Sequence, residues 1–158
     1  MDYDVAIVGS GPAGIHCALE LIEKRPDLRI VMIEKGKPIE FRHCPNSVAA
    51  RGCRKCNPCH ILAGWGGAGA FSDGKLTIST KVGGWLDEII GEDELARLVD
   101  YVDQKYLEHG APEKLYGAGA DDIEHWSTKA SLVGLQLVPQ RVRHMAVSYT
   151  HLTLPTKA

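Results

Sequence analysis

The stretch that decides the fold is "DVAIVGSGPAGIHCALELIEK", residues 4–24. Its first five residues form a short apolar run, which predicts a buried strand over 4–8. Beyond the glycines, apolar side chains recur at helical spacing, so we expect a helix over 12–24 with Pro12 in its first turn. The segment "RIVMI", residues 29–33, predicts a second strand. Together these segments form a β-α-β unit, which implies a parallel sheet and the α/β fold class.

The glycines between the first strand and the helix, "GSGPAG" at 9–14, fit the pattern G-x-G-x-x-G of a dinucleotide-binding turn. Gly9 permits the tight turn, Gly11 lets the backbone approach a pyrophosphate, and Gly14 lets the helix pack closely on the strand. The N-terminus of the helix offers free N–H groups to phosphates. The candidate cofactor-binding residues of this turn are Gly9, Ser10, Gly11, Pro12, Ala13 and Gly14. The alternative is a glycine turn that binds nothing.

An acidic residue, Glu34, directly follows the second strand and lies 20 residues past Gly14. At this place a carboxylate accepts hydrogen bonds from ribose hydroxyls and repels a 2′-phosphate, which argues against NADP at this site. Lys35 follows it and joins the candidate cofactor-binding residues. FAD and NAD both present an ADP half, so these residues do not distinguish between them.

Four cysteines lie within 16 residues, in the order Cys44, Cys53, Cys56 and Cys59. Such x2 spacing resembles the thiolate ligands of a [4Fe–4S] cluster, whereas a structural zinc usually takes two separated C-x2-C pairs. A redox dithiol and four inert thiols are the other interpretations. The basic residues Arg51, Arg54 and Lys55 would lower the thiol pKa values in each case. His43 and His60 flank the cysteines as substitute ligands or as solvated loop residues.

The composition describes an ordinary globular chain of 158 residues with a net charge of −2 and 44% hydrophobic residues. Charges of both signs are interspersed, so nothing favours nucleic acid or an anionic membrane as a partner. The apolar runs are far shorter than the roughly 18 residues of a spanning helix. The N-terminus is acidic and then glycine-rich, unlike a signal peptide, so we expect a cytoplasmic protein. In that compartment, clustered cysteines suggest metal or redox chemistry.

Beyond the second strand, residues 37–75 show little periodicity, which is typical of a functional insertion. An amphipathic pattern then predicts a helix over 93–109, with Gly110 placed to end it. A second helix is expected over 121–133, where Asp121 is the candidate N-cap and Glu124 completes a capping box. The segment "LQLV", residues 135–138, is a candidate strand, and Cys17 is expected to pack in the first helix.

Two stretches resemble known flavoproteins. "YDVAIVGSGPAGIHCALEL", residues 3–21, resembles the opening of two-dinucleotide-fold flavoproteins, whose first unit holds FAD. "GGAGAFSDGKL", residues 66–76, resembles a motif of an uncharacterised bacterial family of FAD-dependent dehydrogenases, and "YLEHGAP" and "VPQRVRH" further on are similar to that family as well. The resemblance covers about residues 3–144. It implies an incomplete Rossmann-like domain of the glutathione-reductase type, which binds FAD and NAD(P).

The resemblance also implies that residues 66–75 lie near the flavin. Closely spaced glycines let backbone N–H groups approach a phosphate or a flavin ring. Trp65 and Phe71 are candidates to cover the ring, or ordinary packing residues. Lys75 would place a positive charge near the flavin, although an ordinary surface turn explains residues 72–75 equally well. The candidate cofactor-binding residues here are Gly66, Gly67, Ala68, Gly69, Ser72, Asp73 and Lys75.

The last residues, 147–158, resemble one reading frame of a transposase-type sequencing adapter, so we expect a non-native tail; the alternative is a short genuine strand. Residues 1–146 would then be the N-terminal part of an FAD-binding domain, with an irregular insertion over 37–75 and a helical segment over 93–133.

The expected function is an FAD-dependent oxidoreductase that transfers a hydride or electrons to or from an unidentified small molecule. NAD(P)H would act as reductant through a domain outside this chain, because 158 residues cannot hold two dinucleotide domains. The alternatives are a metal-binding or redox-sensing module with a structural dinucleotide, and an inactive fragment. No catalytic acid or base is identified; His109 and His144 are candidates by residue type only.

Overall fold

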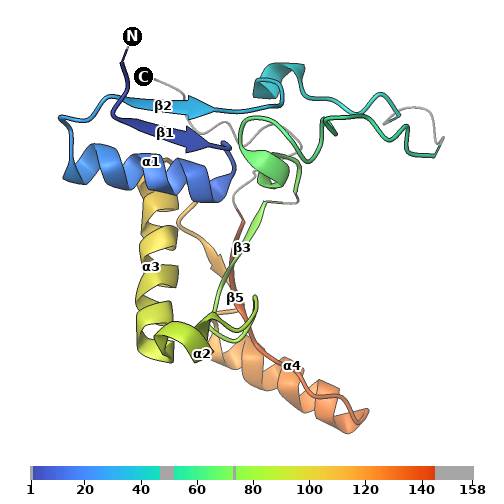
Figure 1. Ribbon diagram of the computed structural model, residues 1–158. Helices are drawn as coiled ribbons and strands as arrows, with labels where there is room; N and C mark the ends of the chain where they lie inside the picture. Colours follow the sequence, from blue (N-terminus) through green and yellow to red (C-terminus); the bar gives the residue numbers. More distant parts are fainter. Residues whose placement is uncertain (1, 47–51, 73, 145–158) are drawn as a thin grey trace. The chain divides into compact units, whose positions relative to one another are not determined.

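The computed structural model describes residues 2–46, 52–72 and 74–144 (Figure 1). The chain divides into two compact units, Met1–Ser72 and Asp73–Ala158. Buried apolar residues are few in the described ranges: Ile7 in the first unit and Ile78 in the second. The expected non-native tail, residues 147–158, lies outside the described residues, and so does Asp73. None of the described helices has the length and apolar character needed to cross a bilayer.

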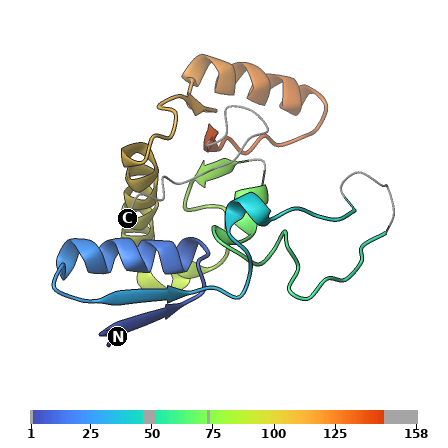
Figure 2. The same cartoon turned by 90° about the horizontal axis from the view of Figure 1, so that it is seen from above.

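The first unit contains the β-α-β arrangement expected from the sequence. Strand β1 (Val5–Val8), helix α1 (Pro12–Lys24) and strand β2 (Ile30–Ile33) follow one another. The two strands pair in parallel, with Val5 opposite Ile30 and Val8 opposite Ile33. Figures 1 and 2 both show α1 running along the two strands, and α1 contacts each of them. The predicted parallel sheet is therefore confirmed for these two strands.

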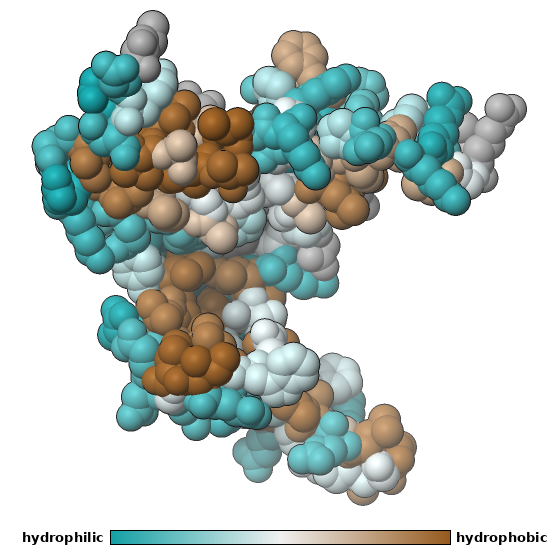
Figure 3. Space-filling model, in the orientation of Figure 1, coloured by the Kyte–Doolittle hydropathy of each residue, from teal (hydrophilic) through white to brown (hydrophobic). Residues whose placement is uncertain are grey.

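Much apolar surface stays uncovered in both units. Val8, at the end of β1, is 84% exposed. In the second unit Ile89 is 79% exposed on the short helix α2 (Leu86–Ile90). In Figure 3 brown apolar surface is visible over the region of β1 and α1 and over the region of α2. The described residues thus bury only a small core, because two strands and one helix offer little surface to one another.

The remainder of the first unit is mostly irregular, as the lack of periodicity over 37–75 predicts. Two short 3₁₀ helices interrupt it, η1 (Ile39–Phe41) and η2 (Gly67–Phe71). Glycine residues in left-handed conformations allow the chain to bend before and inside η2, with φ of +81° at Gly66 and +61° at Gly67. These bends return the chain to the neighbourhood of the first glycine turn.

The second unit is built on an antiparallel sheet that the sequence pattern does not predict. Its strands are β3 (Lys75–Ile78), β4 (Leu115–Tyr116) and β5 (Arg141–His144), in the order β3-β5-β4. The register places Lys75 opposite His144 and Leu115 opposite Arg143. Helices α2, α3 (Glu92–Glu108) and α4 (Ala120–Leu132) complete the unit. Helix α3 matches the expected helix over 93–109.

Two local predictions for this unit are wrong. Residues 135–138 are exposed and form no strand; the chain pairs only from Arg141 onward, where β3 provides the partner. Helix α4 begins one residue earlier than expected, with Gly119 as N-cap and no side-chain capping bond. Asp121 therefore lies inside the first turn, where its charge favours the helix dipole, and Glu124 is not at a capping-box position.

A buried ion pair fastens β5 to α3 within this unit. Arg143 is 3% exposed and donates two hydrogen bonds to the Asp103 carboxylate, at 2.6 Å from Nε and 2.8 Å from Nη2. Its Nη1 donates to the carbonyl of Pro112 at 2.7 Å. These bonds to Asp103 raise the pKa of Arg143. A fork-shaped pair of this kind fixes both partners in one geometry.

Candidate functional site

The first glycine turn has the geometry that its sequence predicts. Gly9 has φ of +99°, and its N–H donates to the carbonyl of Ile33 at 2.8 Å, which joins the turn to β2. A Cβ atom at Gly14 would lie 2.0 Å from the Gly9 carbonyl oxygen, so only glycine lets α1 approach the turn this closely. Around Gly11, by contrast, no heavy atom of the described residues lies within 4 Å of such a Cβ position.

This opening at Gly11 fits an anionic ligand. Gly11 is the N-cap of α1, and no described side chain forms a capping bond there. The first N–H groups of a helix have no partner inside the helix, and they lie at the positive end of its dipole. The structure therefore combines close backbone access with uncapped donors, which is the arrangement that a pyrophosphate requires.

Glu34 lies against the same turn, and its two carboxylate oxygens face the protein's own backbone. Oε2 accepts hydrogen bonds from the Ser10 N–H at 2.9 Å and from the Ser10 hydroxyl at 3.1 Å. Oε1 accepts from the N–H groups of Gly36 at 2.8 Å and Gly64 at 3.0 Å. The N–H donors of Ser10 and Gly36 lower the pKa of Glu34 most, to about 2.

Glu34 is therefore ionised and joins three separate parts of the chain: the glycine turn, the end of β2 and the segment near Gly64. A carboxylate offers about four lone-pair directions, and four donors contact this one. The hydrogen bonds to ribose hydroxyls stay a prediction. Lys35, the next residue, is exposed.

The second glycine-rich stretch packs directly on the first. The Gly66 N–H donates to the Ser10 carbonyl at 2.9 Å. A Cβ atom at Gly67 would lie 3.1 Å from the Cα of Gly11, and one at Gly69 would lie 3.9 Å from the Cγ of Pro12. Residues 66–69 thus form a wall beside the opening of the turn.

The remaining candidates from this stretch lie in η2, directly after it, and in the second unit. Ala68 is an exposed residue of η2, and the Ser72 hydroxyl donates to the Gly69 carbonyl at 3.0 Å. Lys75 begins β3 and belongs to the second unit. Trp65 is half-buried, and Phe71 is partly exposed. The structure therefore brings the glycines together and leaves the roles of Ser72 and Lys75 as predictions.

Arg42 is an organising residue of this region that the sequence analysis did not single out. It is 4% exposed, and its guanidinium lies 4.7 Å from the centre of the Phe71 ring. Among the described residues its hydrogen bonds go to backbone carbonyls alone, those of His60, Ile61, Trp65 and Gly67. Burial lowers the pKa of Arg42, while the charge of Glu34 raises it. A single arginine in an irregular stretch carries no periodicity or spacing that would identify it.

The four clustered cysteines are free thiols. Within the described ranges, no three histidine, cysteine or acidic side chains form a group that could hold a metal ion. Backbone N–H groups of Leu62 and Ile61 lower the pKa of Cys59, with a further contribution from the charge of Arg42. The metal and dithiol interpretations of Cys44, Cys53, Cys56 and Cys59 stay predictions.

Three other residues from the sequence analysis remain, one in the first unit and two in the second. Cys17 is exposed on α1, so its expected packing role is wrong. The His109 Nδ1 lies 2.7 Å from the Lys105 carbonyl, and the His144 ring contacts the Tyr116 ring edge-on. Both histidines belong to the second unit, and a catalytic role for either stays a prediction.

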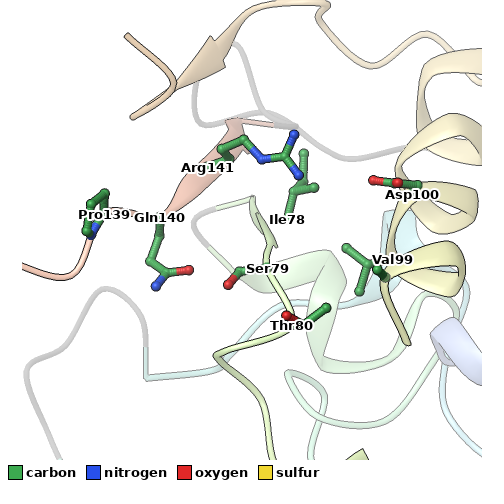
Figure 4. A pocket seen from close by; sticks show the side chains of 9 residues that line it. Ile78, Ser79, Thr80, Val99, Asp100, Pro139, Gln140 and Arg141 are labelled. Carbon is green, nitrogen blue, oxygen red and sulfur yellow. The ribbon is translucent and has the colours of Figure 1, made fainter. Parts of the chain in front are cut away.

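The second unit contains a cavity of about 290 Å³ between β3, α3 and the start of β5 (Figure 4). Its polar lining comes from Ser79, Thr80, Asp100, Gln140 and Arg141, and Ile78 and Val99 contribute apolar surface. None of the candidate cofactor-binding or metal-binding residues lines this cavity.

Parts of this chain are similar to known proteins. Residues 3–82 match the model of a family described as pyridine nucleotide-disulphide oxidoreductase. A thiamine thiazole synthase from Coprinopsis cinerea is 54% identical over 33 residues, which are 21% of this chain and 10% of that protein. An uncharacterised protein from Clostridium beijerinckii is 39% identical over 75 residues, 48% of this chain and 14% of that protein. No solved structure matches. The chain thus spans only a small part of these relatives.

Proposed function

This chain belongs to the pyridine nucleotide-disulphide oxidoreductase family, and on that basis we propose that it forms the FAD-binding N-terminal part of a flavin-dependent oxidoreductase. The family consists of oxidoreductases that bind FAD and NAD(P). The narrower proposal is an FAD-dependent dehydrogenase. The observation that carries it is the contact between the two glycine-rich stretches, which makes one open cradle at Gly11.

The residues present fit the ADP half of FAD. Gly11 and the N-terminus of α1 would receive the pyrophosphate, and residues 66–69 would form the adjoining wall. Glu34 joins the glycine turn to the segment at Gly64 by its hydrogen bonds to Ser10 and Gly64. Bound FAD would supply the hydride or electron transfer, and the chain would supply binding and orientation. A small-molecule substrate, and NAD(P)H bound by a part of the protein outside this chain, complete the proposal.

The cysteines extend this proposal to a second redox group. Cys59 lies directly before the residues whose carbonyls Arg42 binds, and its lowered pKa favours the thiolate. We therefore propose that the cysteine segment exchanges electrons with the flavin, either as a dithiol or through a bound metal centre. Anaerobic purification followed by iron, sulfide and zinc analysis separates these two forms: a metal-free protein with two oxidisable thiols supports the dithiol.

The main test is the visible spectrum of the purified protein after incubation with FAD and removal of free cofactor. The wild-type chain is expected to retain flavin in a one-to-one ratio, and Gly11→Leu is expected to lose it, because the new side chain fills the cradle. Gly52→Leu is the matched control, since its Cβ position is equally open but lies outside the cradle. Flavin retained in full by Gly11→Leu, or absent from the wild type, contradicts the proposal.

A further inference from the structure

Arg42 holds one loop of the chain through nearly all of its donors. A guanidinium has five N–H groups, and four of those of Arg42 donate to carbonyls between residues 60 and 67. The distances are 2.9 Å to His60, 2.6 Å to Ile61, 2.5 Å to Trp65 and 2.9 Å to Gly67. The bonds reach 18 to 25 residues along the chain, so they fix tertiary structure and not a local turn.

One peptide group links Arg42 directly to the glycine turn. The carbonyl of Trp65 accepts from Arg42, and the N–H of the same peptide, which belongs to Gly66, donates to the Ser10 carbonyl at 2.9 Å. Gly67 is fixed in the same way from both sides, because its carbonyl accepts from Arg42 while its Cα faces Gly11. The position of this wall beside the cradle therefore depends on Arg42.

Within the part of the chain that the structure describes, no carboxylate forms an ion pair with Arg42. Glu34 and the thiol of Cys59 act on Arg42 only through their charge. A buried, unpaired cation costs free energy, so a protein that only needed to fill this space would do better with an apolar side chain. An anionic group bound at the neighbouring cradle would offset that cost.

We propose that Arg42 is a positioning residue of the dinucleotide site: it seats residues 64–67 against the glycine turn and adds a fixed positive charge beside the pyrophosphate. This inference rests on the proposed function, since it assumes that a dinucleotide occupies the cradle. Arg42 does not itself contact the cofactor in this account; it acts through the Trp65–Gly66 peptide. Losing the guanidinium should release that peptide without unfolding β1, α1 and β2.

The test uses Arg42→Met and Arg42→Lys in the full chain, with Arg25→Met as control. Arg25 is an exposed arginine of the same unit whose side chain pairs with Asp27. The first readout needs no cofactor: hydrogen exchange at the Gly66 amide, compared with amides of β1 and β2. In both Arg42 variants the Gly66 amide should lose protection while the strand amides keep theirs. In Arg25→Met the Gly66 amide and the strand amides should all keep the protection that they have in the wild type.

The second readout is FAD affinity, measured by quenching of flavin fluorescence. Arg42→Met is expected to raise the dissociation constant at least tenfold. Arg42→Lys keeps the charge but cannot reach four carbonyls with one ammonium group, so a smaller loss is expected. The control should stay within twofold of the wild type.

The inference is wrong if the Gly66 amide stays protected in Arg42→Met. It is also wrong if that protection is lost while the affinity for FAD stays within twofold of the wild type. Failure of both Arg42 variants to fold would overturn it as well. If only Arg42→Met fails to fold, Arg42→Lys is judged by the same criteria. A wild-type chain that binds no FAD refutes the proposed function, whereas wild-type binding with unchanged variants refutes the inference alone.

Discussion

Substitution of Gly14 by alanine tests the close approach of α1 to the glycine turn. The new Cβ would lie 2.0 Å from the Gly9 carbonyl oxygen and 3.4 Å from the Cγ2 of Ile7. Carbon and oxygen in ordinary contact lie about 3.3 Å apart, so the helix or the turn must move by about 1.3 Å. The obstacle is backbone, which cannot rotate away as a side chain could.

The size of the effect follows from two opposing contributions. Overpacking of this kind costs about 3 kcal/mol, the upper end of the usual range, because the clash is with main chain. Alanine gains about 1 kcal/mol over glycine inside a helix. The net loss in free energy of unfolding is therefore about 2 kcal/mol, which is a large share of the total stability of an ordinary domain.

The assay is urea unfolding followed by far-UV circular dichroism, with equal m-values required for comparison. The matched control is Gly11→Ala, where φ is −74° and the Cβ position is open. There the loss of a favourable N-cap residue and the gain in backbone rigidity oppose each other, so stability should stay within about 0.5 kcal/mol. If Gly14→Ala is no less stable than Gly11→Ala, the steric explanation of this glycine is wrong.

Three further predictions concern charges. Asp103→Asn should lower the free energy of unfolding by about 3–5 kcal/mol, because it leaves Arg143 buried without its carboxylate. Asp27→Asn, at an exposed ion pair, should lower it by at most about 1 kcal/mol. Equal urea midpoints for the two variants would contradict this. Since hydrogen bonds hold the folded pKa of Glu34 at about 2, its stabilising contribution is full above the ordinary carboxyl pKa and is lost as the pH falls toward 2. Glu34→Gln should therefore flatten the pH dependence of the unfolding free energy between about 4.5 and about 2, and an unchanged slope would count against it. The pKa of Cys59 is lowered, so its thiol should react at lower pH than an ordinary cysteine. We expect its alkylation rate, followed as a function of pH by mass spectrometry of the peptide, to reach half its maximum below the ordinary thiol pKa of about 8.5. A midpoint at or above that pH refutes the assigned environment.

Local patterns explain which parts of the fold could be predicted. The β-α-β unit and helix α3 follow from short-range periodicity and from glycines whose steric role is visible in the sequence. The antiparallel sheet of the second unit escaped prediction, because its strands are two to four residues long and β3 pairs with a strand that begins at Arg141. Runs that short show no reliable alternation, and exposed apolar residues over 135–138 resembled a strand more than "RVRH" did.

By itself, the sequence determined the glycine turn, its acidic partner Glu34 and the wider pyridine nucleotide-disulphide oxidoreductase family, because each depends on residue type at a fixed spacing. Only the tertiary structure decided what surrounds the turn. It placed Gly67 on Gly11, turned Glu34 toward backbone donors, left the cysteines ungrouped in the described residues and made Arg42 the centre of the loop. The physical reason is that Arg42 binds main-chain carbonyls, which every residue possesses, so no sequence pattern records which ones a folded chain presents to it.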